Sequence, residues 1–575
     1  MSGVLQAPTL ERAFFDLLRE WCGALCELQI KLPDDALRGG ILCPACKTIH
    51  GRCHEAVYPL LYMADRTGDE KYLTAARELF AWGDNMLCGD GAVRNDAKSD
   101  WKGVTVFAAV ALHDALSFHG GLLDAQERLR WRERLAGMGE WLYRNIRVGA
   151  SAYINYYAAN ACAMALLGKY FDRAEYLTAA RDLAEYCFEH ESENGLLYGE
   201  GRPHDLQTAK GCRAIDTGYN AEESLPSLVR CAEALGDTAA LERCRRLYRA
   251  QLAWMLPDGA WDNSVGTRAF KWTCWGSRTA DGCQDALLRL GRGEPVFSEA
   301  AWRNFELLRR CTAHGLLAGG PDYDAAGEPI CVHHTFCHAK ALAAALDAGV
   351  YDFDRTPLPA EDLPPLRYWR ELDTCRLSCG GWIADVTGFD VRRGRGGHVS
   401  GGALSLLWHS SCGAVVAAGM AAYSLLEPHN QQLPQNAAAH RSPCPRIEAK
   451  TDGGTYAQIH DFSAELDSET RDGASVVRVR ANLCNMENEP LQPDGGCTLT
   501  YTLREDGLTV EGSVSPALAR QARLILPVIG KATVSVRRGV TATIQPGFCL
   551  TPGFCFLEYT VSPDGDGCFA VRIGL

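Results

Sequence analysis

The chain has 575 residues, a length that suggests roughly two to four domains of ordinary size. Hydrophobic residues make up 47% of it and charged residues 22%, which excludes wholesale disorder and allows a large buried core. The formal net charge of −13 argues against a general nucleic-acid binder, although a local cluster of Arg and Lys could still bind an acidic ligand.

Neither a transmembrane helix nor a secretory signal is predicted. No run of about 18 apolar residues occurs, and residues 1–15 lack a basic start followed by an apolar stretch. We therefore expect a cytoplasmic protein whose 25 cysteines, an odd number, are mostly reduced and buried.

Residues 1–352 are predicted to form helical hairpins. The string YLTAAR occurs at 72–77 and again at 176–181, each time within an apolar pattern of helical spacing. Short turns with glycine follow several helical runs, at Gly91, Gly195, Gly259 and Gly315. Their intervals fit a repeating hairpin of roughly 50–60 residues, and about six such hairpins close into a toroid or stack as a solenoid.

A proline-rich linker is predicted at 353–374 and an antiparallel β-sheet or sandwich domain at 375–575. Four prolines lie between 357 and 365, a density that stops helices. Beyond them, residues 498–513 alternate around an Asp-Gly turn and read as a β-hairpin. Further strands are predicted at 403–409, 476–481 and 533–536. The fold class is therefore α+β multidomain: an N-terminal (α/α) toroid followed by a C-terminal antiparallel β-sandwich.

Residues 43–55, CPACKTIHGRCHE, carry the first cluster of chemical groups. A zinc site needs about four thiolate or imidazole ligands, and one short loop could supply them. A second C-x-x-C is absent, so structural zinc is only one reading, with candidate ligands Cys43, Cys46 and Cys53. The favoured reading is contact with a substrate, by His50, Arg52 and His54. Packing at the start of a helix is the third.

Two further stretches gather polar groups near predicted helix starts. Asn155 and Tyr156 open an apolar helix, where an Asn is either an N-cap or part of a site. Residues 198–224 hold an unusual density of titratable groups: Glu200, His204, Asp216, Tyr219, Glu222 and Glu223. So many of them near one rim favour a catalytic site over plain loop turns.

Residues 261–283 interleave tryptophans with cations. Sugars stack their apolar faces on indole rings, and Arg pairs with carboxylates through two hydrogen bonds. The candidate substrate-binding residues here are Trp261, Arg268, Lys271, Trp272 and Arg278. In HHTFCH at 333–338, His334 and His338 can share one helical face, and we expect His334 to contact substrate rather than metal. The combination suits an anionic sugar, with a tryptophan-rich core as the alternative.

These features together resemble the heparinase II/III and alginate lyase group of polysaccharide lyases, over nearly the whole chain. In that group an Asn near a helix start neutralises the uronate carboxylate, a later Tyr acts as acid or base, and a His comes from the sheet domain. The resemblance implies these roles for Asn155, Tyr219 and His398, the last in GGHVSGGALSL at 396–406. We expect these three residues to converge on one cleft between the two domains, with His204 nearby. ENGLLYGEG at 193–201 resembles the stretch that leads to the Tyr. His204 stands where that Tyr would fall, and Tyr156 where the group often has His.

The predicted function is therefore degradation of uronic-acid-containing poly- or oligosaccharides by a polysaccharide lyase that cleaves by β-elimination. The alternative is a glycoside hydrolase of the β-glucuronidase kind, which releases terminal glucuronic acid, saturated or unsaturated, and needs paired carboxyl groups. The candidates for these are Glu200, Asp216, Glu222 and Glu223. An epimerase or a non-catalytic carbohydrate-binding protein are further alternatives. We expect an acidic saccharide as partner, neither nucleic acid nor membrane, and no required cofactor.

Overall fold

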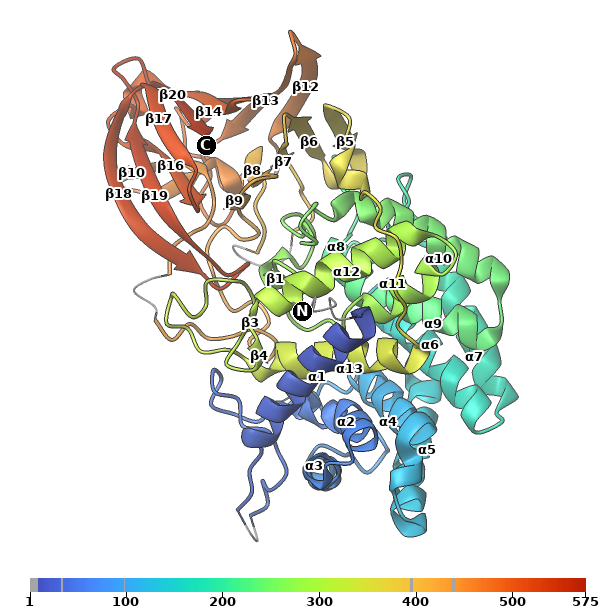
Figure 1. Cartoon of the computed structure of the whole chain (residues 1–575). Coiled ribbons are helices and arrows are strands. Elements are labelled where there is room, and N and C mark those ends of the chain that lie inside the picture. The colour runs from blue at the N-terminus through green and yellow to red at the C-terminus, as the bar shows by residue number, and fades with distance from the viewer. Residues whose placement is uncertain (1–8, 33–34, 98, 393–396, 437–439) are drawn as a thin grey trace, which may run out of the picture.

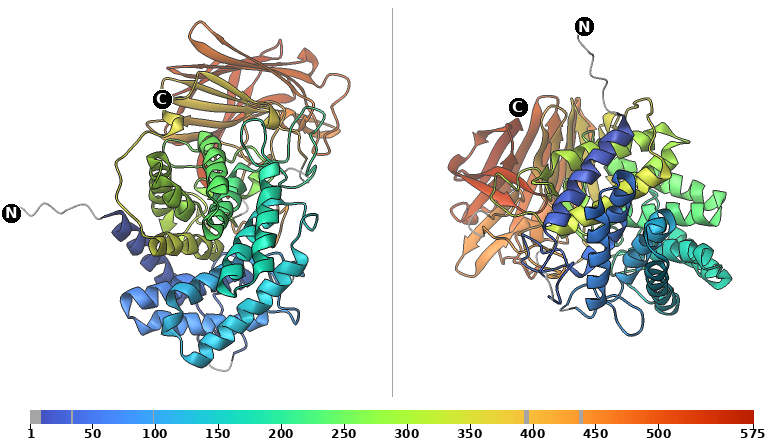
Figure 2. Two further views of the ribbon diagram at one scale, coloured as in Figure 1. Left: turned by 90° about the vertical axis from the view of Figure 1, so that its right-hand side faces the viewer. Right: turned by 60° about the horizontal axis from the view of Figure 1, so that its bottom comes forward.

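The computed structural model describes residues 9–32, 35–97, 99–392, 397–436 and 440–575. Helices occupy the N-terminal part of the chain and antiparallel sheets the C-terminal part, and the two lie against each other (Figure 1). Both views of Figure 2 keep the strands on one side of the helices. The predicted fold class is confirmed. Among the described helices, none combines the length and the apolar character needed to cross a membrane.

An inner ring of helices closes on itself in the N-terminal domain. Its members in the described chain are α2 (Val57–Thr67), α4 (Thr105–His119), α6 (Ile154–Tyr170), α9 (Leu225–Leu235), α11 (Gln284–Gly291) and α13 (Val332–Ala348). Each contacts the next, and α13 contacts α2, so the hairpins form a toroid and not an open solenoid. Helices α4, α6 and α13 are apolar nearly all round because they are buried on nearly every side.

An outer helix packs on each inner helix. These are α1 (Leu10–Glu27), α3 (Glu70–Trp82), α5 (Ala125–Asn145), α7 (Ala174–Glu189), α10 (Thr238–Gln251) and α12 (Pro295–Arg310). Both YLTAAR strings lie in outer helices, where they bury one face against the ring.

Gly-Asp pairs make the tight turns between inner and outer helices. Gly68 ends α2 in the left-handed region (φ 67°), and Asp69 caps α3 by accepting from Lys71 N. Gly236 and Asp237 do the same between α9 and α10. The long loops therefore lie at the opposite rim, where outer helices lead into the next inner helix. Two of them carry short ribbons, β1 (Trp272–Thr273) with β2 (Gly276–Ser277) and β3 (Thr312–Ala313) with β4 (Leu316–Leu317).

Three antiparallel sheets form the C-terminal domain. The first has the order β5-β6-β7-β8-β9, with β5 (Leu366–Trp369), β6 (Thr374–Cys379), β7 (Trp382–Thr387), β8 (Ala403–His409) and β9 (Gly413–Ala417). The second has the order β11-β10-β16-β19-β18, with β10 (Arg446–Thr451), β11 (Gly454–Ala457), β16 (Ala522–Ile529), β18 (Val540–Cys549) and β19 (Phe554–Ser562). The third has the order β12-β13-β14-β15-β20-β17, with β12 (Glu465–Arg471), β13 (Ala474–Asn482), β14 (Gly496–Arg504), β15 (Gly507–Val514), β17 (Thr533–Arg538) and β20 (Cys568–Gly574). The predicted hairpin at 498–513 is the pair β14–β15.

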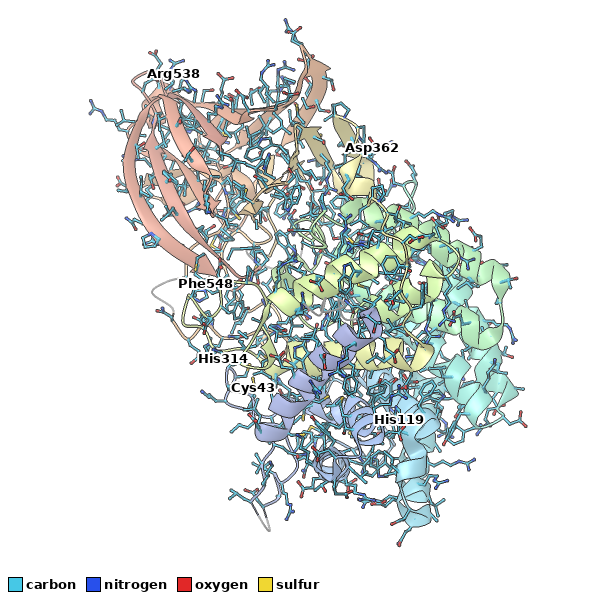
Figure 3. All side chains as sticks on the ribbon, viewed as in Figure 1. Cys43, His119, His314, Asp362, Arg538 and Phe548 are labelled. Atoms are coloured by element: carbon cyan, nitrogen blue, oxygen red, sulfur yellow. The ribbon has the colours of Figure 1, made fainter. Side chains whose placement is uncertain are left out.

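The first sheet is buried on both faces, which is why its strands read as continuous apolar runs. Along β8, Leu406 and Trp408 join the core of the helical domain, whereas Leu407 joins the core of the other two sheets. From the second sheet, Phe548 at the end of β18 also joins the helical core (Figure 3). A buried arginine, Arg376 on β6, bonds Asp385 of β7 and Asp262 of the helical domain. The interface between the domains is therefore both apolar and charge-paired.

The first strand begins earlier than the sequence predicted. Helix α13 ends at Ala348, and β5 already starts at Leu366, inside the stretch 353–374 that was predicted to be a linker. Proline density excludes a helix there, but an edge strand can begin directly after the last proline.

Candidate active site

A cleft of about 300 Å³ opens where the long loops of the toroid meet a loop of the sheet domain. Its polar and aromatic lining includes Arg52, Asn95, Trp101, Tyr153, Asn155, Tyr156, Tyr219, Glu223, Arg268, Lys271, Thr279, Glu427, His429 and Asn430. Most of these residues stand at or just before the N-terminal ends of inner helices. Those ends carry partial positive charge, so the cleft favours an anionic ligand.

Tyr219 places its hydroxyl group in the wall of this cleft. It ends the short helix α8 (Thr217–Tyr219), which Asp216 caps by accepting from Tyr219 N at 2.9 Å. The hydroxyl oxygen bonds the Thr279 hydroxyl and accepts a hydrogen bond from Lys271 Nζ at 3.2 Å. Burial raises the pKa of Tyr219 well above its usual value, against the lowering effect of Arg268. The phenol is therefore protonated at neutral pH, with two cations beside it.

Those two cations are buried and paired with acids. The Arg268 guanidinium lies over the Tyr219 ring, 4.5 Å from its centroid, and its Nε is 3.2 Å from Glu200 Oε1. Lys271 Nζ lies 2.5 Å from Glu427 Oε2. Because Glu427 belongs to the loop between β9 and β10, this ion pair joins the sheet domain to the toroid inside the cleft.

Asn155 and Glu223 form a hydrogen-bonded pair on another wall. Asn155, in the first turn of α6, donates from Nδ2 to Glu223 Oε1, and its backbone N–H donates to Glu200 Oε2 at 3.3 Å. Burial raises the pKa of Glu223 to about 8, with Asp281 adding to the rise and Arg52 opposing it. Asn155 Oδ1 and Glu223 Oε2 are buried without a hydrogen-bond partner among the described residues. A ligand that fills the cleft can bond to them.

The loop 427–430 brings a histidine from the sheet domain to the cleft. Glu427 bonds Lys271, Asn430 Oδ1 accepts from Asn95 Nδ2 at 3.3 Å, and the Asn430 carbonyl accepts from Arg278 Nε at 3.0 Å. His429 lies between these anchors and lines the cleft with an exposed side chain. Among the lining residues that the structure describes, it is the one histidine.

Trp101 offers the cleft an exposed indole. Its side chain is 43% exposed, and its Nε1 donates to the Tyr156 hydroxyl at 2.9 Å. The two rings meet edge to face at 5.2 Å. An indole fixed in this way is a platform on which a sugar ring can stack.

Five of the seven candidate catalytic residues lie outside the lining. His398 is buried, with Nε2 3.1 Å from the Phe389 carbonyl and its ring between Phe389 and Phe462, and burial lowers its pKa to about 4. His204 bonds the Tyr186 hydroxyl at 2.9 Å. The predicted convergence of Asn155, Tyr219 and His398 is therefore wrong for His398, because the turn before β8 faces the interior of the domain interface.

Three of the candidate carboxylates, Glu200, Asp216 and Glu222, are fully buried beneath the lining of the cleft, where they bind other protein groups. Glu200 pairs with Arg268, and Asp216 caps α8 and also accepts from Arg268 N at 2.7 Å. Glu222 accepts from Ser277 N at 2.7 Å. Gly276 packs so closely on Glu222 that a Cβ atom there would lie 1.9 Å from its Oε2.

Of the candidate substrate-binding residues, some line the cleft and others are buried beneath it. Four line the cleft: Arg52, Tyr156, Arg268 and Lys271. The others lie beneath it: His50, His54, Trp261, Trp272, Arg278 and His334. Trp272 Nε1 donates to the Trp261 carbonyl at 2.9 Å, so these two indoles are core and not sugar platforms. His54 Nδ1 lies 2.7 Å from the Gly51 carbonyl, and His334 Nδ1 lies 3.2 Å from the Leu317 carbonyl.

Sequence reasoning missed Asn95, Trp101 and the loop 427–430. Trp101 stands in the long loop before α4, a position equivalent to those that were singled out before α6 and α9. That equivalence was the available signal. The loop 427–430 lacks periodic or motif signals, and only the packing of the sheet domain brings it to the rim.

Both parts of the chain match families of known proteins. Residues 18–358 match the Ulvan lyase N-terminal domain and residues 366–545 the Ulvan lyase C-terminal domain. The chain is 38% identical over 529 residues to a broad-specificity ulvan lyase of Formosa agariphila, over 89% of this chain and 82% of that protein. A solved chondroitin AC lyase of Streptomyces coelicolor A3, in complex with chondroitin sulphate, matches at a TM-score of 0.52 and 11% identity. That match covers 99% of this chain and 80% of the other, and it concerns the fold alone.

Proposed function

Since the chain belongs to the ulvan lyase family and is thus a polysaccharide lyase that cleaves by β-elimination, we propose that its substrate is ulvan and that Tyr219 is its proton donor. Ulvan is a sulfated uronic-acid polysaccharide. The proposal for the substrate is supported by the identity to the Formosa enzyme and by the cations and helix ends around the cleft.

The position of the Tyr219 hydroxyl carries the catalytic part of the proposal. In β-elimination the C5–H bond breaks, its electrons form the C4=C5 double bond, and the C4–O bond breaks, so the leaving oxygen needs a proton. A buried phenol that holds its proton at neutral pH is suited to give it. Lys271 Nζ, 3.2 Å from the phenol oxygen, and Arg268 over the ring stabilise the phenolate that results.

In this proposal Asn155 and Glu223 neutralise the uronate carboxylate. The C5 proton is weakly acidic until the adjacent carboxylate is neutralised, because charge then develops on that group. With its pKa near 8, Glu223 is protonated at neutral pH and can donate a hydrogen bond to the substrate. Asn155, at the positive end of α6, uses one Nδ2 hydrogen on Glu223 and can donate the second to the same carboxylate.

His429 is the base in this scheme. It is the imidazole of the described lining, and the loop that carries it is tied to Lys271, Asn95 and Arg278 on both flanks. An imidazole in its neutral form can accept the C5 proton. The proton donor, Tyr219, then comes from the helical domain, and the proton acceptor, His429, comes from the sheet domain.

The geometry disfavours the hydrolase alternative. Hydrolysis of a glycoside requires two carboxyl groups that face the scissile bond. Glu200, Asp216 and Glu222 are fully buried and outside the lining. Of the two carboxyl groups in the described lining, Glu427 is tied to Lys271 and Glu223 to Asn155.

Tyr219→Phe tests the proposal on ulvan. Formation of the 4,5-unsaturated product, followed by its ultraviolet absorbance, should fall by about 10²-fold or more in kcat with little change in KM. Tyr186→Phe is the matched control, because this tyrosine bonds His204 outside the cleft and should leave the rate unchanged. A fully active Tyr219→Phe enzyme would refute the catalytic assignment. Wild-type activity on another uronate polysaccharide and none on ulvan would refute the substrate.

A further inference from the structure

Four metal-binding side chains from two distant segments meet beside the cleft. Cys43, Cys46 and His50 come from the loop between α1 and α2, where Figure 3 labels Cys43. Cys331 comes from the residue that precedes α13. None of the four lines the cleft, and three of them are fully or almost fully buried.

Their spacing fits tetrahedral coordination. Cys331 Sγ lies 3.7 Å from Cys43 Sγ, 3.7 Å from Cys46 Sγ and 3.4 Å from His50 Nε2, and all four ligand atoms lie within 4.8 Å of one another. With Zn–S bonds of about 2.3 Å and a Zn–N bond of about 2.0 Å, a tetrahedron separates its sulfurs by about 3.8 Å and sulfur from nitrogen by about 3.5 Å. A disulfide would need sulfurs about 2.05 Å apart and could pair only two of the three.

The loop backbone is shaped for the same purpose. Cys46 N donates to Cys43 Sγ at 3.3 Å, a hydrogen bond that stabilises a thiolate. Lys47 adopts a left-handed conformation (φ 53°) and donates from its N to the Cys43 carbonyl. The turn thereby directs both sulfurs of the C-x-x-C pair towards Cys331.

A buried arginine supplies an independent sign of negative charge at this place. Arg278 is 6% exposed, and its Nη2 donates to Cys331 Sγ at 3.1 Å, while Nη1 lies 3.3 Å from His334 Nε2. Among the described residues no carboxylate forms an ion pair with it. A buried guanidinium requires an anionic partner. Three thiolates, one neutral imidazole and Zn²⁺ sum to one negative charge, which Arg278 balances.

We propose that Cys43, Cys46, His50 and Cys331 bind one structural zinc ion. All four positions of the tetrahedron are protein ligands, so the ion holds the fold and does not meet substrate. It fastens the loop 43–50 to the start of α13, which lies 288 residues further along the chain and closes the ring beside it. Through Arg278, which also donates to the Asn430 carbonyl, it supports the loop that presents His429.

Metal analysis of the purified full-length protein tests this directly. Mass spectrometry of the metals should find about one zinc per chain, retained through gel filtration. Titration with an organomercurial, which attacks thiolates, should release this zinc to a chromogenic chelator. Cobalt substitution should produce a thiolate-to-cobalt charge-transfer band in the near ultraviolet.

Cys331→Ser should lower the bound zinc by more than about tenfold. Cys274→Ser is the matched control, since Cys274 is also buried and its Sγ lies 3.4 Å from Cys311 Sγ, but among the described residues this pair belongs to no group of three or more possible metal ligands. This variant should retain its zinc. Cys53→Ser should retain it as well, because Cys53 lies outside the four-residue cluster.

Three results would overturn the proposal. Protein without zinc but with 25 titratable thiols would make the group a plain thiol cluster. Fewer thiols in the absence of reductant, again without zinc, would indicate a disulfide. Full zinc content in Cys331→Ser would place the ion elsewhere. Should that variant fail to fold, the metal and thiol counts of the unaltered protein decide, and neither depends on lyase activity.

Discussion

Replacing Glu223 with Gln tests whether this carboxyl group works in its protonated form. Burial raises its pKa from 4.5 to about 8, so the folded protein keeps the proton over a range in which the unfolded chain has lost it. Gln has nearly the same shape, is neutral at every pH and can still accept the hydrogen bond from Asn155 Nδ2. The variant therefore removes the titration and little else.

The direction in which the free energy of unfolding changes with pH follows from the number of protons that the folded and the unfolded states bind. Between pH 4.5 and about 8 the folded wild type binds one proton more at this site than the unfolded chain does. The stability that Glu223 contributes is thus fully present below pH 4.5 and is lost as the pH rises to about 8. One pKa unit corresponds to about 1.4 kcal/mol, so the loss relative to Glu223→Gln is at most about 5 kcal/mol.

Denaturant unfolding of both proteins between pH 5 and 9 measures this difference. The free energy of unfolding of Glu223→Gln minus that of the wild type should rise from pH 5 to about 8 and then level off. Other groups titrate equally in both proteins and cancel. Glu299→Gln is the control of opposite sign: although burial opposes them, Arg355 and Arg303, each 2.6 Å away, hold the pKa of Glu299 below its usual range. Its stabilisation is lost only at acid pH, so its difference should stay constant from pH 5 to 9.

A difference for Glu223→Gln that stays constant over the same range, or that falls as the pH rises, would refute the reasoning. Kinetics add a second criterion. If the neutral carboxyl group donates to the substrate, Gln replaces it as a donor, and kcat/KM should stay within about tenfold of the wild type. The decline of wild-type activity above about pH 8 should then disappear. A loss of about 10²-fold or more at every pH would instead identify Glu223 as a base.

The remaining predictions concern other parts of the cleft. Trp101→Ala should raise KM on ulvan by about tenfold and leave kcat nearly unchanged, because stacking binds ground state and transition state alike; a fall in kcat alone would contradict this. Lys271→Met should lower kcat by about 10²-fold, since it removes the cation beside the phenolate; a change confined to KM would contradict that role. His429→Ala should lower kcat by about 10²-fold or more, whereas His398→Ala should lower the melting temperature and leave kcat unchanged. Equal kcat values in these two variants would reject His429 as the base.

The fold was predictable because its signals are local. Gly68-Asp69 and Gly236-Asp237 predict the turns of two hairpins, because the glycine adopts a left-handed conformation and the aspartate caps the next helix. The alternation of apolar and polar residues on both sides of the turn at Asp506 predicts β14 and β15. The start of β5 was missed because the prolines before it mark where a helix cannot run and leave open where a strand begins.

The site was predictable only where helix geometry decides it. Asn155 and Tyr219 were found because they stand at the starts of inner segments, which a closed ring brings to one rim. Glu222 and Glu223 are neighbours on the π-helix η4 (Asn220–Ser224), and only the structure shows that Glu223 lines the cleft while Glu222 turns to Ser277. For the histidine of the sheet domain the sequence offered a motif at His398, whereas His429 is the histidine that lines the cleft. Long-range packing, which no motif reports, decides which loop of the sheet domain reaches the toroid.

The contacts of the loop 427–430 make the sheet domain a part of the active site. Without that loop Lys271 would lose Glu427, its counter-ion 2.5 Å away, and the cleft would lose His429. The toroid alone would also expose the apolar face that Leu406 and Trp408 cover from β8. Arg278 carries this dependence further, since the same guanidinium bonds the Asn430 carbonyl and Cys331 Sγ. The proposed zinc site, the domain packing and the loop that carries the proposed base are therefore linked through one buried side chain. A change at the proposed metal ligands should then reach catalysis through the geometry of the loop and not through the metal itself.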